Sequence, residues 1–305
     1  MANVTTPNVI TEMQASFGEM HRLPGSNSMF VVGDEAARVY FRYSKVHRRG
    51  QAFFGLRKLD LLQLEGRNSF IALLTDDGSP AVFLPYIDFE ALFQEISPAS
   101  DGQYKVQLLR GHGTRELYVP KRGRFNVNAY TGLETVRQSI EADKLRARLD
   151  LTHCQVQTLL GAIGASKGYE VFVPASDICS LDWSLTPRFP LREGVPAGYT
   201  DIQPILSEID VLWVASGRNE IEGLFEVEHS TPIYSGLLRF NDVLLTNPKV
   251  SRFFVVSNDE RRDLFVRQLA RPTFRRSGLS EITSFLEYAN VADWYTRASK
   301  GVDHG

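Results

Sequence analysis

Two short apolar segments in the second half of the chain restrict its fold more than any other feature of the sequence. They are EIDVLWVA (208–215) and IEGLFEVE (221–228), both rich in the aliphatic and aromatic residues that favour β-strands. The five residues between them, 216–220, are polar and include a glycine, and a loop of this kind favours a β-hairpin. We therefore expect a strand–turn–strand unit at this place.

Three carboxylates are expected on one face of that hairpin. Symmetric closure about Arg218 places Asp210 directly opposite Glu226, and Glu228 shares the face of Glu226 because side chains alternate along a strand. Opposed β-carbons lie about 5 Å apart, so like charges there repel each other. A bound Mg²⁺ would relieve the repulsion, since it prefers carboxylate oxygens. Acidic residues that alternate with apolar ones also mark the solvated face of an amphipathic strand, and the spacing alone favours neither interpretation.

Helices and apolar strands alternate around the predicted hairpin. A helix is predicted after Thr152, a plausible N-cap, and is expected to end at Gly168. YEVFVPASD (169–177) is predicted as a strand, and the proline-containing segment 180–205 as a loop. A helix, a strand and a second helix are predicted further along, at SGLLRFNDVLL (235–245), SRFFVVS (251–257) and NDERRDLFVRQLA (258–270). This order predicts an α/β domain over 136–305, with a central mixed sheet flanked by helices.

The hairpin carboxylates resemble the active-site signature of a known nuclease superfamily. Asp210, then a strand–turn–strand, then Glu226-x-Glu228 is similar to the motif of the PD-(D/E)xK superfamily, in particular its Type II restriction-endonuclease-like members. The resemblance implies that Asp210 and Glu226 bind metal. Glu228 stands where most members carry Lys, which implies a base or a second metal ligand in this Glu-x-Glu variant.

The order of elements extends the resemblance over roughly residues 150–290. It implies a restriction-endonuclease-like fold for the second half. Gln157 corresponds best to the inward polar residue on the family's helix before the core strands, and is therefore a candidate catalytic residue.

The resemblance implies Mg²⁺-dependent hydrolysis of phosphodiester bonds in double-stranded DNA, for restriction or defence, with the ion activating water. An alternative of another class is a catalytically silent DNA-binding or regulatory protein that keeps the nuclease fold, which Glu228 in place of Lys favours. An RNA-processing or repair nuclease would share the chemistry and differ in substrate. Many enzymes that cut both strands are dimers, so family analogy leaves a homodimer open.

Four residues near the motif invite a functional and a structural interpretation. His229 follows Glu228 and is expected to have a structural role. His153, at a helix start, could approach the site but is expected to be solvated. Asp177 is expected to cap a turn in preference to binding metal. Arg239, on the helix after the second strand, is a candidate phosphate ligand or a member of a surface ion pair.

The first half, 1–135, is predicted to be a β-rich α+β domain that recognises DNA. Its strands are broken by turn signals, and the segment 42–58 carries basic residues without any Asp or Glu. Basic charge attracts phosphates, and the interleaved Phe41, Tyr43, Phe53 and Phe54 could stack on bases. A solvated loop between strands is the other interpretation. The candidate DNA contacts in this half are Arg42, Lys45, Arg48, Arg49, Lys121 and Arg122.

Composition limits the class of protein. The formal net charge of −2 over 305 residues means that any nucleic-acid surface must be a local patch. Only two cysteines are present, Cys154 and Cys179; they are expected in the core, and two cannot make a structural zinc site alone. The first residues lack the pattern of a secretory signal, and no apolar run reaches the roughly 20 residues of a membrane span. We therefore expect a cytoplasmic protein with no membrane partner.

Overall fold

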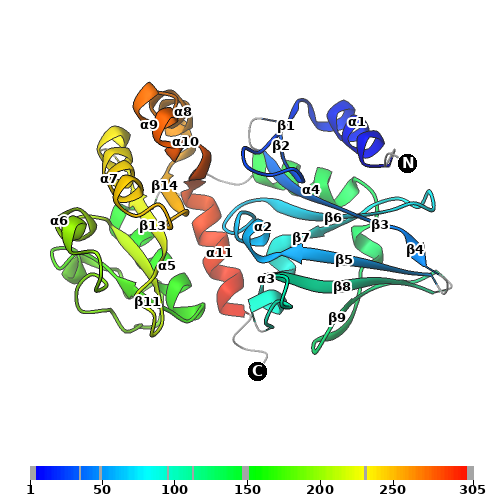
Figure 1. The fold of residues 1–305 in the computed structure, drawn as a ribbon, viewed down its shortest axis with the longest axis horizontal. Coiled ribbons are helices and arrows are strands. Elements are labelled where there is room, and N and C mark those ends of the chain that lie inside the picture. Colours follow the sequence, from blue (N-terminus) through cyan, green and yellow to red (C-terminus); the bar gives the residue numbers. More distant parts are fainter. Residues whose placement is uncertain are drawn as a thin grey trace. The chain divides into compact units, whose positions relative to one another are not determined.

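The computed structural model describes residues 5–33, 36–47, 50–94, 96–111, 113–145, 151–229 and 232–300. The chain divides into two compact units, Met1–Ala147 and Arg148–Gly305 (Figure 1). The boundary follows Ala147, whereas the sequence placed it at 135, because helix α4 (Glu134–Leu145) belongs to the first unit. Within the described residues, no helix has the length and apolar character needed to cross a membrane.

Two five-stranded sheets form the first unit. The first sheet has the order β1-β2-β3-β6-β7, in which β3 and β6 are parallel and the other pairs antiparallel. The second has the order β10-β9-β8-β5-β4 and is antiparallel throughout. The strands are β1 (Met20–Arg22), β2 (Met29–Val32), β3 (Ala37–Ser44), β4 (Val46–His47), β5 (Gln51–Arg57), β6 (Ser69–Thr75), β7 (Val82–Pro85), β8 (Gln103–Arg110), β9 (Arg115–Val119) and β10 (Gly123–Asn126).

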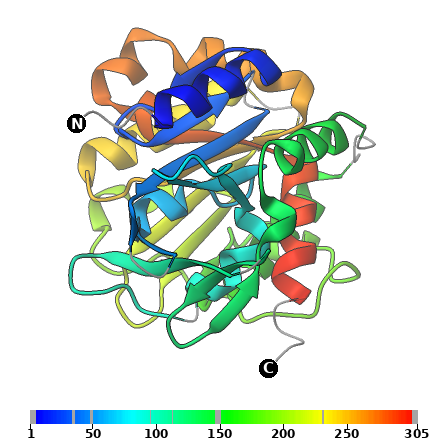
Figure 2. The ribbon, with the colours of Figure 1, turned by 90° about the vertical axis from the view of Figure 1, so that its right-hand side faces the viewer.

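The first sheet is buried on both faces. Tyr40 of β3 packs in the core between the two sheets, whereas its neighbours Val39 and Phe41 pack in a separate core with Met13 of α1 (Thr5–Phe17) and Val136 of α4. The alternation follows from the two-residue period of a strand. Helices α2 (Lys58–Leu62) and α3 (Tyr86–Gln94) contribute to the core between the sheets, and the turn η1 (Asn128–Tyr130) precedes α4. Figure 2 shows the same elements from the side.

A mixed five-stranded sheet forms the centre of the second unit. Its order is β11-β12-β13-β14-β15, with β11, β12 and β13 joined antiparallel and β13, β14 and β15 joined parallel. The strands are β11 (Tyr169–Phe172), β12 (Val211–Ala215), β13 (Ile221–Val227), β14 (Phe253–Ser257) and β15 (Thr283–Glu287). Every residue of β12 and β14 is buried, as expected of strands covered on both faces.

Helices cover both faces of this sheet. α5 (His153–Ser166) and α11 (Tyr288–Lys300) pack on the face that carries Trp213 and Phe225. The opposite face, which carries Leu212 and Leu224, is covered by α6 (Gln203–Leu206), α7 (Ile233–Thr246), α8 (Arg262–Leu269), α9 (Pro272–Ser277) and α10 (Leu279–Ile282). The short turns are η2 (Ile178–Ser180), η3 (Thr200–Ile202) and η4 (Asp259–Arg261). The chain is therefore a mixed α and β protein, as the sequence predicted.

Helix α5 starts and packs as its sequence indicates. The Thr152 hydroxyl accepts from the backbone N–H of Gln155, whose side chain in turn accepts from the Thr152 N–H, so the pair forms a capping box. Gly168, with φ of 80°, follows its last turn. At Gly164 a β-carbon would lie 2.4 Å from Nε1 of Trp213, so only glycine lets the helix approach β12 this closely.

The hairpin has the predicted register beside the site. Val211 pairs with Phe225 and Trp213 with Gly223, which is the pairing that symmetric closure about Arg218 gives. The register shifts between Trp213 and Val214, so a β-bulge lies on the side of the turn, away from Asp210.

Candidate active site

Asp210 lies at the start of β12, where three elements meet. One carboxylate oxygen, Oδ2, accepts a 2.6 Å hydrogen bond from the backbone N–H of Val227, at the end of β13. The other, Oδ1, lies 3.3 Å from Nε2 of His153, and the Asp210 carbonyl accepts a 2.9 Å bond from the side chain of Gln157. The side chain is therefore fixed by the hairpin partner and faces the start of α5.

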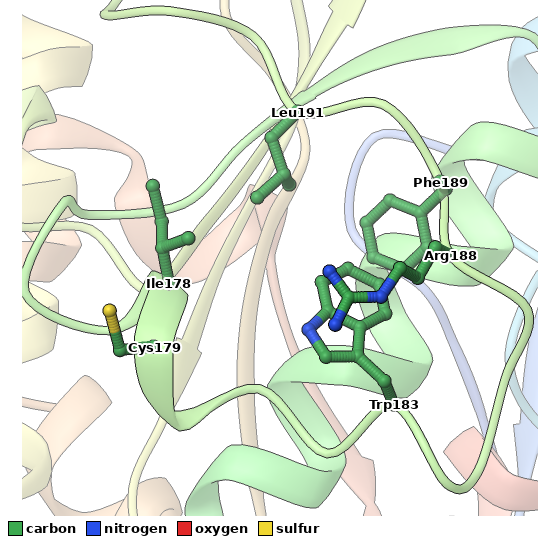
Figure 3. A pocket seen from close by; sticks show the side chains of 6 residues that line it. All are labelled: Ile178, Cys179, Trp183, Arg188, Phe189 and Leu191. Carbon is green, nitrogen blue, oxygen red and sulfur yellow. The ribbon is translucent and has the colours of Figure 1, made fainter.

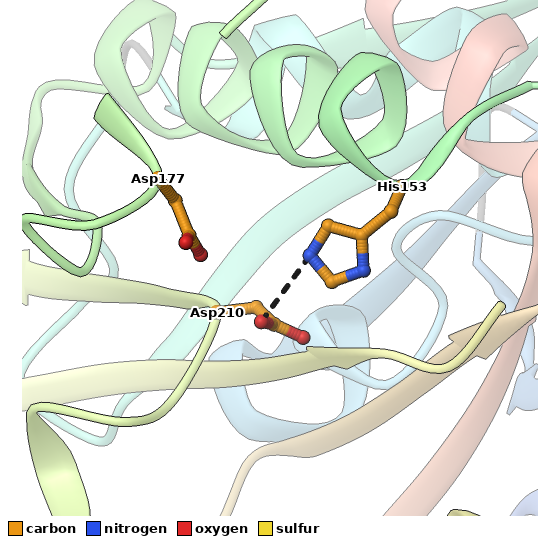
Figure 4. Close-up of side chains that lie close together, drawn as sticks. All are labelled: His153, Asp177 and Asp210. Carbon is orange, nitrogen blue, oxygen red and sulfur yellow. Dashed lines mark ion pairs between the residues drawn. The ribbon is translucent and has the colours of Figure 1, made fainter. Parts of the chain in front are cut away.

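His153 and Asp177 complete a cluster with Asp210. His153 opens α5, and Asp177 precedes η2, after the end of β11. One potential ligand atom from each of the three residues lies within 4.8 Å of the others, and Figure 4 shows the side chains turned toward one another. Hydrogen bonding to Asp210 raises the pKa of His153, and the charge of Asp177 adds to this. The sequence favoured a solvated histidine and a turn cap over a role at the site for these two residues, so the cluster as a whole was not anticipated.

Gln157 is fully buried and connects the two aspartates. Its side-chain nitrogen donates to Oδ2 of Asp177 at 3.0 Å and to the carbonyl oxygen of Asp210 at 2.9 Å, which uses both of its hydrogens. Among the described residues, its side-chain oxygen has no hydrogen-bond partner. The inward orientation expected of Gln157 is thus observed.

Glu226 lies almost fully buried, with an exposed fraction of 1%, and is paired with Arg239 of α7. Arg239 donates two hydrogen bonds of 2.7 Å, one to each carboxylate oxygen. Burial raises the pKa of Glu226 to about 8; the guanidinium opposes this shift, and the charges of Asp210 and Glu228 add to it. The charges of Asp210 and Glu228 therefore both act on the carboxyl group of Glu226.

Arg239 was a candidate for phosphate binding or for an ion pair. The structure shows the ion pair, but with a buried carboxylate instead of an exposed one. Glu208 lies further from the guanidinium, at 4.0 Å. A phosphate would have to share the guanidinium with Glu226.

Glu228 follows β13 and is also buried. Its backbone carbonyl accepts hydrogen bonds from the Ser257 hydroxyl at 2.5 Å and from Arg261 at 2.7 Å. A β-carbon at Gly236 of α7 would lie 2.8 Å from Oε1 of Glu228 and 3.2 Å from Cβ of Glu226. Both side chains therefore lie under α7, on the same face of the sheet, and a glycine leaves room for them.

His229 has a structural environment. Its ring is stacked on Tyr288 with a centroid distance of 6.2 Å, and Nδ1 lies 3.4 Å from the tyrosine hydroxyl. This contact is consistent with the structural role expected from its sequence position. The expectation of two core cysteines is wrong for Cys179, which is exposed on the turn η2, while Cys154 is half-buried.

A cavity of about 490 Å³ is lined by residues of the turn η2 and of the loop that the sequence predicted at 180–205. Arg188 places its guanidinium over the Trp183 ring, 5.2 Å from the centroid, so that face of the indole is already covered (Figure 3). The lining residues are Ile178, Cys179, Trp183, Arg188, Phe189 and Leu191. The wall is thus mainly apolar, with one cation.

The basic candidates of the first unit do not form one patch. Lys45 lies just before β4, and Lys121 and Arg122 lie between β9 and β10, both exposed; β4 and β10 are the opposite edge strands of the second sheet. Arg42 is half-buried, with its guanidinium 5.6 Å from the Tyr40 ring centroid. Residues 48 and 49, the arginines of the sequence prediction, lie outside the described residues.

The aromatic part of that prediction needs correction. Phe41 and Phe54 are buried in the two cores of the first unit, so they are not available for stacking on bases. Phe53 is 48% exposed, and Tyr43 is half-buried. The segment is also strand β5 over most of its second half, not a solvated loop.

Comparison with known families finds a match in the second unit. Residues 194–302 match the family model described as the Type II restriction enzyme NmeDI C-terminal domain. The match includes the hairpin carboxylates and Arg239, and begins after His153, Gln157 and Asp177. It supports a relationship of this segment to a restriction-endonuclease family. Among curated proteins, the comparison finds no match to this chain.

Proposed function

We propose that the protein is a Mg²⁺-dependent endonuclease of the PD-(D/E)xK type that hydrolyses double-stranded DNA in restriction or defence. The observation that carries the proposal is the hairpin register, in which Val211 pairs with Phe225, the neighbours of Asp210 and Glu226, within the segment that matches a restriction enzyme domain. Val227, next to Glu226, donates its backbone N–H to the Asp210 carboxylate, so the two acids are held at one end of the hairpin.

The donor set fits Mg²⁺. Asp210, Glu226 and Glu228 offer oxygen ligands, and burial together with mutual repulsion makes a compensating cation favourable. Arg239 supplies one such cation now, but a carboxylate has about four lone-pair sites, so Glu226 can bind an ion while keeping a bond to the guanidinium. When bound, Mg²⁺ would supply an activated water and stabilise charge on the phosphate.

The protein side chains would divide the remaining work. Asp210 and Glu226 would hold the ion, and Glu228, under α7 beside Glu226, would serve as base or as a further ligand. Gln157 fixes Asp210 through its carbonyl group and so acts as a positioning residue. We also propose that basic residues of the first unit contact DNA, with Lys45 and Lys121 on separate edges of its second sheet.

One observation favours the catalytically silent alternative, a DNA-binding or regulatory protein. Arg239 neutralises Glu226 with two hydrogen bonds, and a buried pair of this kind can serve structure alone. The test is cleavage of unmodified double-stranded DNA with Mg²⁺ and with EDTA, together with DNA binding by the same protein. Binding without Mg²⁺-dependent cleavage would replace the proposed function by this alternative.

A further inference from the structure

His153, Asp177 and Asp210 come from three elements that are far apart in sequence, yet their ligand atoms meet within 4.8 Å (Figure 4). His153 is the first residue of α5, Asp177 directly precedes η2, and Asp210 directly precedes β12. One imidazole nitrogen and two carboxylate oxygens are a donor set for divalent cations. We infer that these three residues form a second metal site, which binds a first-row transition-metal ion such as Mn²⁺ in preference to Mg²⁺.

Gln157 holds the two aspartates of the cluster in place. Its amide nitrogen bonds the Asp177 carboxylate and the Asp210 carbonyl, at 3.0 Å and 2.9 Å, so both aspartates are oriented before any ion binds. Groups that orient metal ligands in this way are a regular part of metal sites. The fully buried Gln157 leaves its side-chain oxygen without a partner among the described residues. Native proteins rarely leave such a buried group unpaired, so this oxygen is a place where a water or ligand would be stabilised.

The ligand type determines the preference among cations. Mg²⁺ favours oxygen ligands and retains its waters, whereas an imidazole nitrogen suits transition-metal ions. Mn²⁺ is the weakest binder of the first-row divalent series, so its binding is a stricter criterion than binding of Ni²⁺ or Cu²⁺, which exposed histidines capture readily.

Asp210 connects this site to the proposed Mg²⁺ site. Its Oδ1 faces His153, while Glu226 lies across the hairpin. An ion held by His153 and Asp177 would thus share Asp210 with an ion held by Glu226, and two ions can act together on one phosphate. This role rests on the proposed function, whereas binding of the ion depends only on the cluster.

The test is a titration of the full-length protein with Mn²⁺, followed by electron paramagnetic resonance. We expect pulsed spectra to show coupling to a histidine nitrogen, and His153→Gln to remove it. Asp177→Asn should lower Mn²⁺ affinity at least about tenfold, the scale on which loss of an outer-shell partner already acts. Asp201→Asn, an exposed aspartate of η3, should bind Mn²⁺ as the wild type does.

The outcomes separate the two proposals. Glu226→Gln should keep the nitrogen coupling, because Glu226 is not a member of the cluster. Coupling without any DNA cleavage would leave the metal site standing and remove the proposed function. Mn²⁺ binding that is unchanged in both His153→Gln and Asp177→Asn would overturn the inference, even if the enzyme cleaves DNA. Thermal unfolding of each variant verifies that it is folded, and the two substitutions test the site independently.

Discussion

Arg239 of α7 donates a hydrogen bond to each carboxylate oxygen of Glu226. Removing the guanidinium alone would leave a carboxylate of 1% exposure without its cation. We therefore expect Arg239→Met to lower the free energy of unfolding by about 3–5 kcal/mol, measured by urea denaturation.

The matched control for Arg239 is Arg218→Met in the hairpin turn, where the arginine is exposed and 4.0 Å from Glu220. Its effect should stay within about 0.5 kcal/mol. The double variant Glu226→Gln with Arg239→Met should recover part of the lost stability, because no unpaired charge remains. Equal stability of the wild type and Arg239→Met would show that the pair is not needed to compensate Glu226.

Glu228→Lys introduces the residue that the PD-(D/E)xK motif usually carries at the corresponding position, and we expect it to impair this protein. The side chain is buried under α7, where a β-carbon at Gly236 would already lie 2.8 Å from its Oε1, and a lysine brings a positive charge close to Arg239 and to any bound ion. We expect cleavage with Mg²⁺ to fall about 100-fold or more, the lower range of what a general base contributes. Single-turnover rates measure this. Activity equal to the wild type would mean that Glu228 has no special role.

Gly164 is required by the close contact between α5 and β12. Gly164→Ala places a methyl group 2.4 Å from Nε1 of Trp213, and the indole N–H also donates to the carbonyl of Leu160. We expect a loss of about 1–3 kcal/mol in unfolding free energy, typical of overpacking. Ser166→Ala, at an exposed position of the same helix, is the control. A neutral Gly164→Ala would show that the helix can shift without cost.

The salt dependence of DNA affinity can show which basic residues of the first unit contact phosphates. The slope of log affinity against log salt is negative, and each lost phosphate contact reduces its magnitude by about 0.9. If the basic candidates of the first unit contact DNA, Lys121→Ala with Arg122→Ala should reduce the magnitude of the slope by nearly twice this amount. Arg48→Ala with Arg49→Ala should have a similar effect. Filter binding of the full-length protein at several salt concentrations measures the slopes. Unchanged slopes in both double variants would show that these residues do not contact phosphates and would assign DNA recognition to the second unit.

The hairpin was predictable because its determinants are local. Two apolar segments and a short polar loop fix the pairing of Val211 with Phe225, and the bulge at Trp213 changes it only toward the turn. The helix that Thr152 opens was predictable for the same reason, since its capping box lies within four residues.

The cluster around Asp210 was not predictable in the same way. His153 and Asp177 reach it only because β11 pairs with β12 and α5 packs on the same sheet. The sequence signals that could have pointed to it are the capping box, which places His153 in the first turn of α5, and the position of Asp177 after a strand. Phe41 was misjudged because burial on both faces of β3 depends on helices from both ends of the unit.

Asp210 is the residue on which the proposed nuclease depends most directly, and Asp210→Asn changes its charge with little change in shape. The most direct measurement is cleavage of unmodified double-stranded DNA by wild type and Asp210→Asn at equal concentration, with Mg²⁺ or EDTA, alongside DNA binding. We predict discrete fragments only for the wild type with Mg²⁺, and DNA binding by the variant that is equal or tighter because repulsion of phosphate is reduced. Cleavage by Asp210→Asn at the wild-type rate would contradict the proposed active site.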